Sequence, residues 1–167
     1  MAILNILAYP DPRLRKVATP VTTVSPEVQK LVSDMAETMY AAPGVGLAAT
    51  QVDVHKRILV IDLSETRDEL RVFINPEILA AEGKSECEEG CLSVPGFYDK
   101  VMRAARIRVR AQNARGVTFE LDAEGMLAVC IQHEMEHLAG KIFVDHLSPL
   151  KQARLLARLR KKQRLAG

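Results

Sequence analysis

The segment His133-Glu134-Met135-Glu136-His137 has the residue types and the spacing of a metal-dependent hydrolase. Side chains four positions apart lie one above the other on a helix, so both imidazoles can reach the same ion. Glu134 then stands beside that ion as a general base for a water molecule that the ion holds as the nucleophile. We therefore expect His133 and His137 to be metal ligands and Glu134 to be catalytic.

The third ligand has to come from elsewhere, because a catalytic ion of this kind usually takes three protein ligands. Phe143 occupies the position six residues after His137 where one class of proteases has a third histidine. No glutamate follows His137, and Asp145 is the only carboxylate downstream of it. We therefore expect the third ligand to lie upstream.

Two cysteines upstream of the histidines offer a soft thiolate for a divalent ion. Cys91 follows the flexible Gly90 and is the candidate, while Cys87 is a rival that spacing alone leaves open. The chain has three cysteines, an odd number, and its N-terminus has no export signal. Reduced thiols in a reducing compartment are therefore expected, and not a disulfide framework.

Length and composition indicate one globular unit, which we predict to be a single catalytic domain over residues 1–167. The chain has 48% hydrophobic and 26% charged residues and a net charge of +2. These values exclude a disordered chain and a globally basic nucleic-acid-binding protein. Because no apolar run reaches the roughly 18 residues of a membrane span, we expect a cytoplasmic protein.

Short segments rich in β-branched residues occupy the middle of the chain, at residues 57–63, 71–79, 106–113 and 117–124. Turn-forming residues separate them, so they predict mostly antiparallel strands. The stretch 42–51 places small residues around two glycines and is predicted to be a loop with a close backbone approach.

Helical spacing is found in three further segments. Ser25-Pro26 begins a scaffold helix over residues 27–40, and a basic amphipathic helix is expected over 148–167. Between them, residues 125–138 carry both motif histidines on one inward-pointing face, together with Met126, Val129 and Cys130. The predicted fold is α+β, with mostly antiparallel strands around a central helix that bears the HExxH motif, and a C-terminal helix.

Three segments of the chain resemble the signature motifs of peptide deformylases, in the order of that family: Gly44-Val45-Gly46-Leu47-Ala48-Ala49-Thr50-Gln51, Glu89-Gly90-Cys91-Leu92-Ser93 and Gln132-His133-Glu134-Met135-Glu136-His137-Leu138. The resemblance covers nearly the whole chain and is to the bacterial type with a helical C-terminus. It implies an enzyme that removes the N-formyl group from the formylmethionine of nascent polypeptides and releases formate.

The resemblance also implies roles for individual residues. One Fe²⁺ per chain, replaceable by Zn²⁺, Ni²⁺ or Co²⁺, would be held by Cys91, His133 and His137. Glu134 would be the general base and acid, and the Gln51 amide and the Leu92 backbone N–H the oxyanion donors. Substrate would be bound by Val45, Gly46, Cys87, Glu89, Gly90, Met126, Val129 and Cys130.

The chain departs from the family pattern at two places. Glu136 stands where the third motif usually has aspartate, so a contact made there is expected to be re-aimed. Gly96-Phe97-Tyr98 lies in a loop that varies within the family and borders the cleft. His55 and His146 belong to no motif and are taken as ordinary surface or structural histidines.

The basic helix at 148–167 suggests a partner, because the family binds ribosomes through this segment. We expect contact with the ribosome, no DNA or membrane partner, and a monomer. Two alternatives remain at this point: another metal-dependent amidase or peptidase, and a non-catalytic, metal-stabilised RNA-binding module. The second is disfavoured because a structural zinc site normally has four protein ligands.

Overall fold

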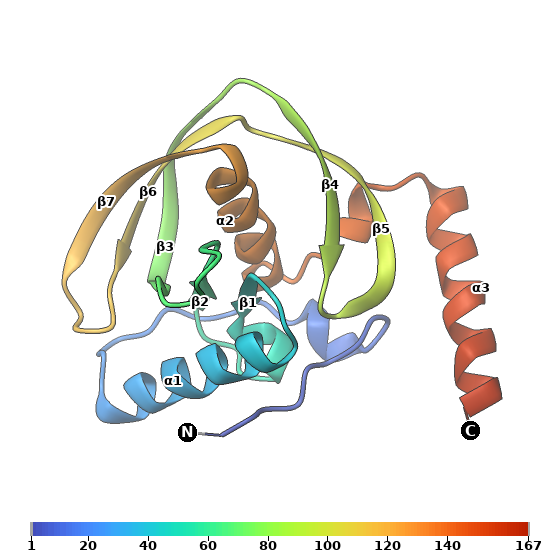
Figure 1. Cartoon of the computed structure of the whole chain (residues 1–167), viewed down its shortest axis with the longest axis horizontal. Helices are drawn as coiled ribbons and strands as arrows, with labels where there is room; N and C mark the ends of the chain where they lie inside the picture. Colours follow the sequence, from blue (N-terminus) through green and yellow to red (C-terminus); the bar gives the residue numbers. More distant parts are fainter. Residues whose placement is uncertain (1, 167) are drawn as a thin grey trace.

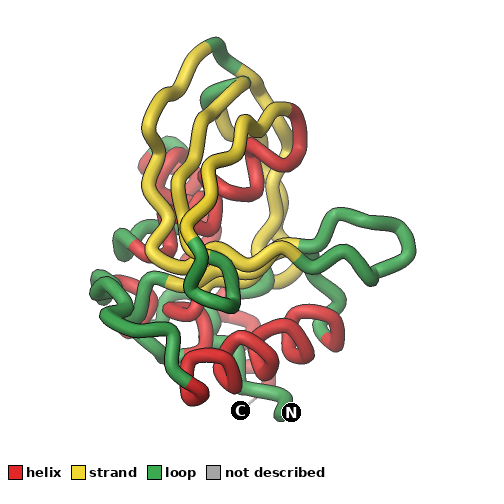
Figure 2. Tube along the Cα trace, turned by 90° about the vertical axis from the view of Figure 1, so that its left-hand side faces the viewer, coloured by secondary structure: helices red, strands yellow, loops and turns green. Residues whose placement is uncertain are grey.

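The computed structural model describes residues 2–166 and has the predicted α+β fold, in which one helix lies between two antiparallel sheets (Figure 1). The larger sheet has the order β1-β2-β3-β6-β7, with β1 (Gly46–Ala48), β2 (Ile58–Ile61), β3 (Arg71–Glu82), β6 (Arg106–Gln112) and β7 (Thr118–Glu124). The smaller is the hairpin of β4 (Ser85–Cys91) and β5 (Val94–Arg103). Figure 2 shows the strands around the helix, with a second helix crossing below them.

The central helix is α2 (Gly125–Leu138), with the bounds that the sequence predicts. Its fully buried Ala128, Ile131 and Leu138 belong to the same apolar cluster as residues of the larger sheet such as Phe73 and Val109. Burial of such side chains is the main stabilisation of an amphipathic helix. Because that contact fixes one face of α2, its motif histidines are turned toward the hairpin.

The hairpin β4–β5 was not among the predicted strands, although it brings the second motif to α2. Its ladder pairs Gly90 with Tyr98 and is irregular between Gly90 and Cys91. A Cβ atom at Gly90 would collide with Cε1 of Tyr98, so a side chain there would displace the ring. Many of the residues of β4 are glutamate or glycine, which have weak strand propensity, and the prediction therefore missed it.

The predicted loop over 42–51 was wrong for its second half, which contains β1 and the 3₁₀ helix η2 (Ala49–Val52). A three-residue strand is too short to show an alternating pattern, and β1 exists because it pairs with β2. Below the sheet, α1 (Pro26–Ala41) begins at Ser25, whose side chain accepts a hydrogen bond from the Val28 N–H at 3.3 Å.

The C-terminal helix is α3 (Pro149–Ala166), and residue 167 of the predicted segment lies outside the described part. It stands at the edge of the molecule in Figure 1. Leu155 is buried in an apolar cluster with Leu14 and Phe143, whereas Leu150 is exposed. Among residues 2–166 no helix combines the length and the apolar character that crossing a membrane requires.

Candidate active site

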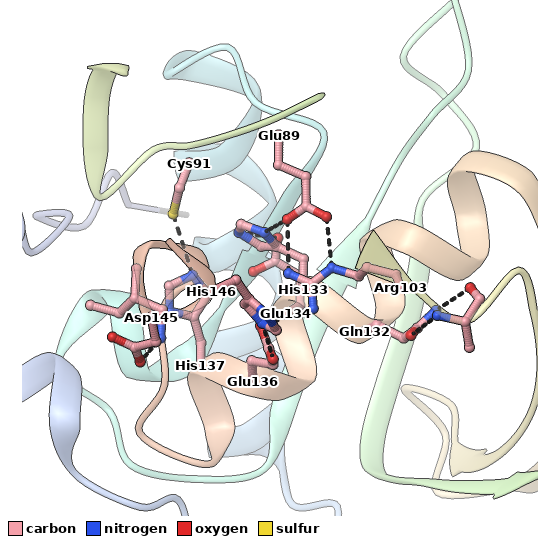
Figure 3. A network of polar contacts seen from close by, with 12 residues as sticks. Glu89, Cys91, Arg103, Gln132, His133, Glu134, Glu136, His137, Asp145 and His146 are labelled. Carbon is pink, nitrogen blue, oxygen red and sulfur yellow. Dashed lines mark hydrogen bonds and ion pairs between the residues drawn. The ribbon is translucent and has the colours of Figure 1, made fainter. Parts of the chain in front are cut away.

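Three potential metal ligands converge between α2 and the end of β4 (Figure 3). The ligand atoms of Cys91, His133 and His137 all lie within 4.8 Å of one another, and Cys91 Sγ is 3.3 Å from His137 Nε2. The helix supplies both histidines, as its spacing predicts. Cys87, the rival thiol, is not part of this group.

The orientation of each imidazole suits metal binding. His133 Nδ1 lies 2.8 Å from Glu89 Oε1, which leaves Nε2 to face the centre. His137 is fully buried, and burial together with nearby positive charge lowers its pKa well below the usual range. His137 is therefore neutral, which is the form that binds a metal ion. One thiol and two imidazoles thus fit a single divalent ion.

Glu134 is buried beside this group, and its Oε1 has no hydrogen-bond partner in the described part of the chain. Its Oε2 is 4.0 Å from His133 Nε2. Burial, with a smaller contribution from the charge of Glu89, raises the pKa of Glu134 to about 7. A carboxylate with this pKa can both accept and return a proton near neutral pH.

The backbone of Gly46 approaches Glu134 very closely. A Cβ atom at Gly46 would lie only 2.6 Å from Glu134 Oε2. A residue without a side chain is therefore required where β1 passes the carboxylate. The predicted close backbone approach in the first motif is confirmed at this glycine.

Gln51 is buried with its amide held in one orientation. Its Oε1 accepts a hydrogen bond from the Ala48 N–H at 2.9 Å, so its amide nitrogen faces the opposite way. That nitrogen donates to Ser93 Oγ at 3.1 Å and lies 3.5 Å from Cys91 Sγ. The amide donors of Gln51 are thus fixed beside the metal-ligand group by Ser93, a partner that sequence spacing does not predict.

Arg103 is a residue of the site that the sequence did not reveal. It is buried at the end of β5 and makes two hydrogen bonds to Glu89, from Nε at 2.6 Å and from Nη2 at 2.8 Å. Although burial opposes ionisation of Glu89, hydrogen bonds from Arg103 and His133 lower its pKa to about 2. A lone arginine at a strand end gives no sequence signal, because its partner is known only from the fold.

A cleft of about 780 Å³ opens above these residues. It is lined by most of the predicted substrate-binding and catalytic residues: Val45, Gly46, Gln51, Glu89, Gly90, Cys91, Leu92, Met126, Val129, Cys130, His133 and Glu134. Tyr98 also lines it; the predicted variable loop at Gly96-Phe97-Tyr98 was wrong, because these residues belong to β5 and Tyr98 pairs with Gly90 of β4. Cys87 is half-buried on β4 and is not among the lining residues, so its place in the pocket wall stays a prediction.

A thiol and two imidazoles beside a buried, unpartnered carboxylate at a cleft are typical of metal-dependent hydrolases. The family model of polypeptide deformylase matches residues 3–153, and the chain belongs to this family. Its members remove N-formyl groups from nascent polypeptides, so the deformylase predicted from the three motifs is confirmed.

Relatives of known name are similar over almost their whole length. Peptide deformylase 2 of Nitrosomonas europaea is 66% identical over 98% of this chain and 89% of its own. A peptide deformylase structure from Legionella pneumophila is 51% identical and has a TM-score of 0.93, covering 99% and 98% of the two chains. One from Ehrlichia chaffeensis, in complex with actinonin, is 41% identical, with a TM-score of 0.94 and coverage of 98% and 99%.

Proposed function

We propose that this deformylase hydrolyses the formamide bond of N-formylmethionyl peptides at the centre formed by Cys91, His133, His137 and Glu134. The observation that carries the proposal is the unpartnered, buried Oε1 of Glu134 beside three converging ligand atoms. A buried polar atom without a partner is costly. Its presence supports a role that Glu134 performs only when water and substrate enter the cleft.

Cys91, His133 and His137 would hold one divalent ion, and we propose Fe²⁺ as the native metal, replaceable by Zn²⁺, Ni²⁺ or Co²⁺. A thiolate and two imidazoles suit several of these ions, which supports a metal site but does not select iron. When bound, the ion would make water more acidic and polarise the formyl carbonyl. Metal analysis of protein prepared without oxygen, compared with protein prepared in air, tests the preference for iron.

Glu134 would move the proton. With a pKa of about 7 it can take a proton from the attacking water and later give it to the departing methionine amine. Formate and a free N-terminal amine result, and the carboxylate returns to its starting state. The close passage of the Gly46 backbone supports this role, because any side chain at that position would displace the Glu134 carboxylate.

Negative charge that develops on the formyl oxygen would be stabilised by the Gln51 amide and the Leu92 N–H. Preorganised donors contribute strongly in a buried site because they need no reorientation during the reaction. The bond from Ala48 to Gln51 Oε1 provides such preorganisation. Gln51→Leu removes the donors, and we expect a loss in kcat of about 100-fold or more with the metal content unchanged.

The cleft supports binding of an extended peptide. β1 is an edge strand, and Gly44, Val45 and Gly46 line the cleft, so the substrate backbone would pair beside β1. We place the methionine side chain against Met126, Val129 and Cys130. Since a relative is solved with actinonin, we also propose that this cleft binds actinonin.

We propose that α3 contacts the ribosome. Exposed cations on α3 that make no ion pair in the described part of the chain are Arg154, Arg158, Arg160, Lys161, Lys162 and Arg164. Such a helix would bind RNA phosphates with an affinity that falls as salt rises. A nascent-peptide substrate also favours a cytoplasmic enzyme, and a site built from one chain favours a monomer of one catalytic domain.

Charge substitution tests ribosome contact better than deletion after Pro149, because deletion would also remove the buried Leu155. Replacing Arg158, Lys161 and Lys162 by glutamate should abolish cosedimentation with ribosomes while hydrolysis of a short formyl peptide is retained. Unchanged cosedimentation would contradict the proposal.

The overall proposal is tested by formate release from a formyl-Met tripeptide, with the same peptide bearing an acetyl cap or a free amine as controls. We expect release only from the formyl peptide, by protein that holds about one ion per chain. Cleavage of internal peptide bonds instead would favour the other class of metal-dependent peptidase.

A further inference from the structure

Glu136, the residue that departs from the usual aspartate of the third motif, contacts two residues outside the motifs (Figure 3). Its Oε1 lies 2.9 Å from Nη1 of Arg103, an ion pair, and its Oε2 lies 2.7 Å from Nε2 of His146. The side chain of Arg103 is 3% exposed, that of Glu136 22% and that of His146 36%. Glu136 therefore stands between a buried guanidinium and an imidazole at the surface.

These contacts continue to a metal ligand. Glu136 contacts Arg103, Arg103 holds Glu89 through two hydrogen bonds, and Glu89 accepts from His133 Nδ1 at 2.8 Å. A carboxylate that accepts from the distal nitrogen of a ligating histidine fixes its tautomer and ring plane. The contacts among Arg103, Glu89 and His133 are buried, whereas Glu136 is partly exposed.

We propose that Glu136 is a positioning residue for the metal ligand His133, acting through Arg103 and Glu89, and that His146 holds Glu136 in place. Glu89 contacts Nε and Nη2 of the guanidinium, and Glu136 faces the remaining Nη1. The ion pair with Glu136 adds a second electrostatic attraction, at a nitrogen that Glu89 does not contact, so both carboxylates hold the guanidinium in place. A fixed Arg103 in turn fixes Glu89 against His133.

A purely structural role is the alternative. Through His146, Glu136 also ties α2 to the 3₁₀ helix η3 (Phe143–His146). Phe143 of η3 packs near His133, with ring centroids 6.0 Å apart. Asp145 anchors the same element to Arg15 through hydrogen bonds of 2.6 and 3.0 Å. Asp145→Asn is therefore a matched control that loosens η3 and leaves the pair of Glu136 with Arg103 in place.

The test measures the Kd for Co²⁺ and Zn²⁺ by chelator competition, the visible absorption of the Co²⁺ form, and thermal unfolding of the metal-free protein. We expect Glu136→Gln to weaken metal binding by about 3- to 30-fold and to shift the Co²⁺ absorption. Glu136→Asp keeps the charge near Arg103 and should restore the affinity to within about threefold of the wild type. Asp145→Asn should lower the unfolding temperature without changing affinity or absorption.

The proposal is overturned if Glu136→Gln binds metal as tightly as the wild type, or if Asp145→Asn loses affinity to the same extent. The inference rests on the proposed metal site, and the two are tested separately. Binding of about one ion per chain by the wild type tests the site itself. A wild type that binds no ion overturns both, whereas normal wild-type binding with an unaffected Glu136→Gln overturns only the role of Glu136.

Discussion

Two groups of arginines in this molecule make similar bonds in different surroundings. Arg103 bonds to Glu89 at 2.6 and 2.8 Å, with side-chain exposures of 3% and 5%. On β6, exposed arginines make cross-strand bonds to carboxylates at 2.8 and 2.9 Å, and Arg108 and its partner Asp122 are 45% and 77% exposed. Bond length alone therefore does not distinguish the two groups.

The two kinds of ion pair differ in the cost of the unpaired charge that remains when one partner is removed. An exposed charge that loses its partner is hydrated by water, and the attraction is already weak in a medium of high dielectric constant. A buried charge that loses its partner has no such replacement. The β6 pairs therefore lie on a sheet surface, whereas the pair of Arg103 with Glu89 is buried beside the candidate metal centre.

The largest effect is expected from Glu134, whose buried Oε1 has no hydrogen-bond partner among residues 2–166. Glu134→Gln keeps the shape but cannot accept a proton, so kcat should fall by about 100- to 10,000-fold with the metal content retained. Glu120→Gln, which removes a carboxylate from the exposed β6 pairs, should leave kcat unchanged. Rates and metal content measured on both variants check this, and substantial turnover by Glu134→Gln would refute the proposed base.

Arg103→Met tests the comparison directly. It leaves Glu89 and Glu136 without their cation, and we expect the free energy of unfolding of the metal-free protein to fall by about 3–5 kcal/mol. Arg108→Met removes an exposed arginine whose ion pairs have similar lengths. Only a small change in the free energy of unfolding is expected there. Urea unfolding of both variants gives these free energies. Equal losses would show that burial does not determine how much an ion pair contributes to stability.

Gly46→Ala should displace the buried Glu134 carboxylate by steric contact alone. Its new Cβ atom would lie 2.6 Å from Glu134 Oε2, so the carboxylate must move, and kcat should fall by about 10- to 100-fold. Gly44→Ala makes a contact of the same length with Leu92 Cδ1, the flexible end of an apolar side chain. Steady-state kinetics should show the smaller effect for Gly44→Ala; the reverse order would contradict the proposed position of Glu134.

The smallest effect concerns acid stability. Glu89 has a pKa of about 2 in the folded protein against an ordinary value of 4.5, so the unfolded state binds its proton first. The stabilisation is complete above pH 4.5 and is lost as the pH falls toward 2. Metal-free Glu89→Gln should therefore lose less stability than the wild type across this range, although it starts lower. Denaturant unfolding at several pH values measures the slope, and identical slopes would contradict the prediction.

Some parts of the site follow from local sequence because they depend on one element. The α2 bounds were predicted correctly, and a spacing of four residues puts His133 and His137 on one face whatever surrounds them. Strands β2, β3, β6 and β7 were foreseen from their β-branched residues. By contrast, β4 and β5 were missed, because the pairing between them, and not their composition, makes them strands.

Other parts were visible in sequence but could not be interpreted there. Nothing in the sequence distinguishes Arg103 from the other arginines, and His146 belongs to no motif. Both contact Glu136 only because β5 and η3 meet α2 there. The choice between Cys87 and Cys91 was likewise open on spacing and was suggested by the family resemblance.

The sequence by itself determined that the two histidines lie on one helical face, named Glu134 as the candidate base beside them, and indicated the family. Only the tertiary structure decided which distant residues complete the centre: Cys91 reaches His137 across 46 positions, and Glu89 reaches His133 across 44. The physical reason is the separation along the chain over which each kind of interaction acts. Helical periodicity is a property of adjacent turns, whereas the meeting of β4 with α2 depends on how the hairpin and the large sheet pack around that helix.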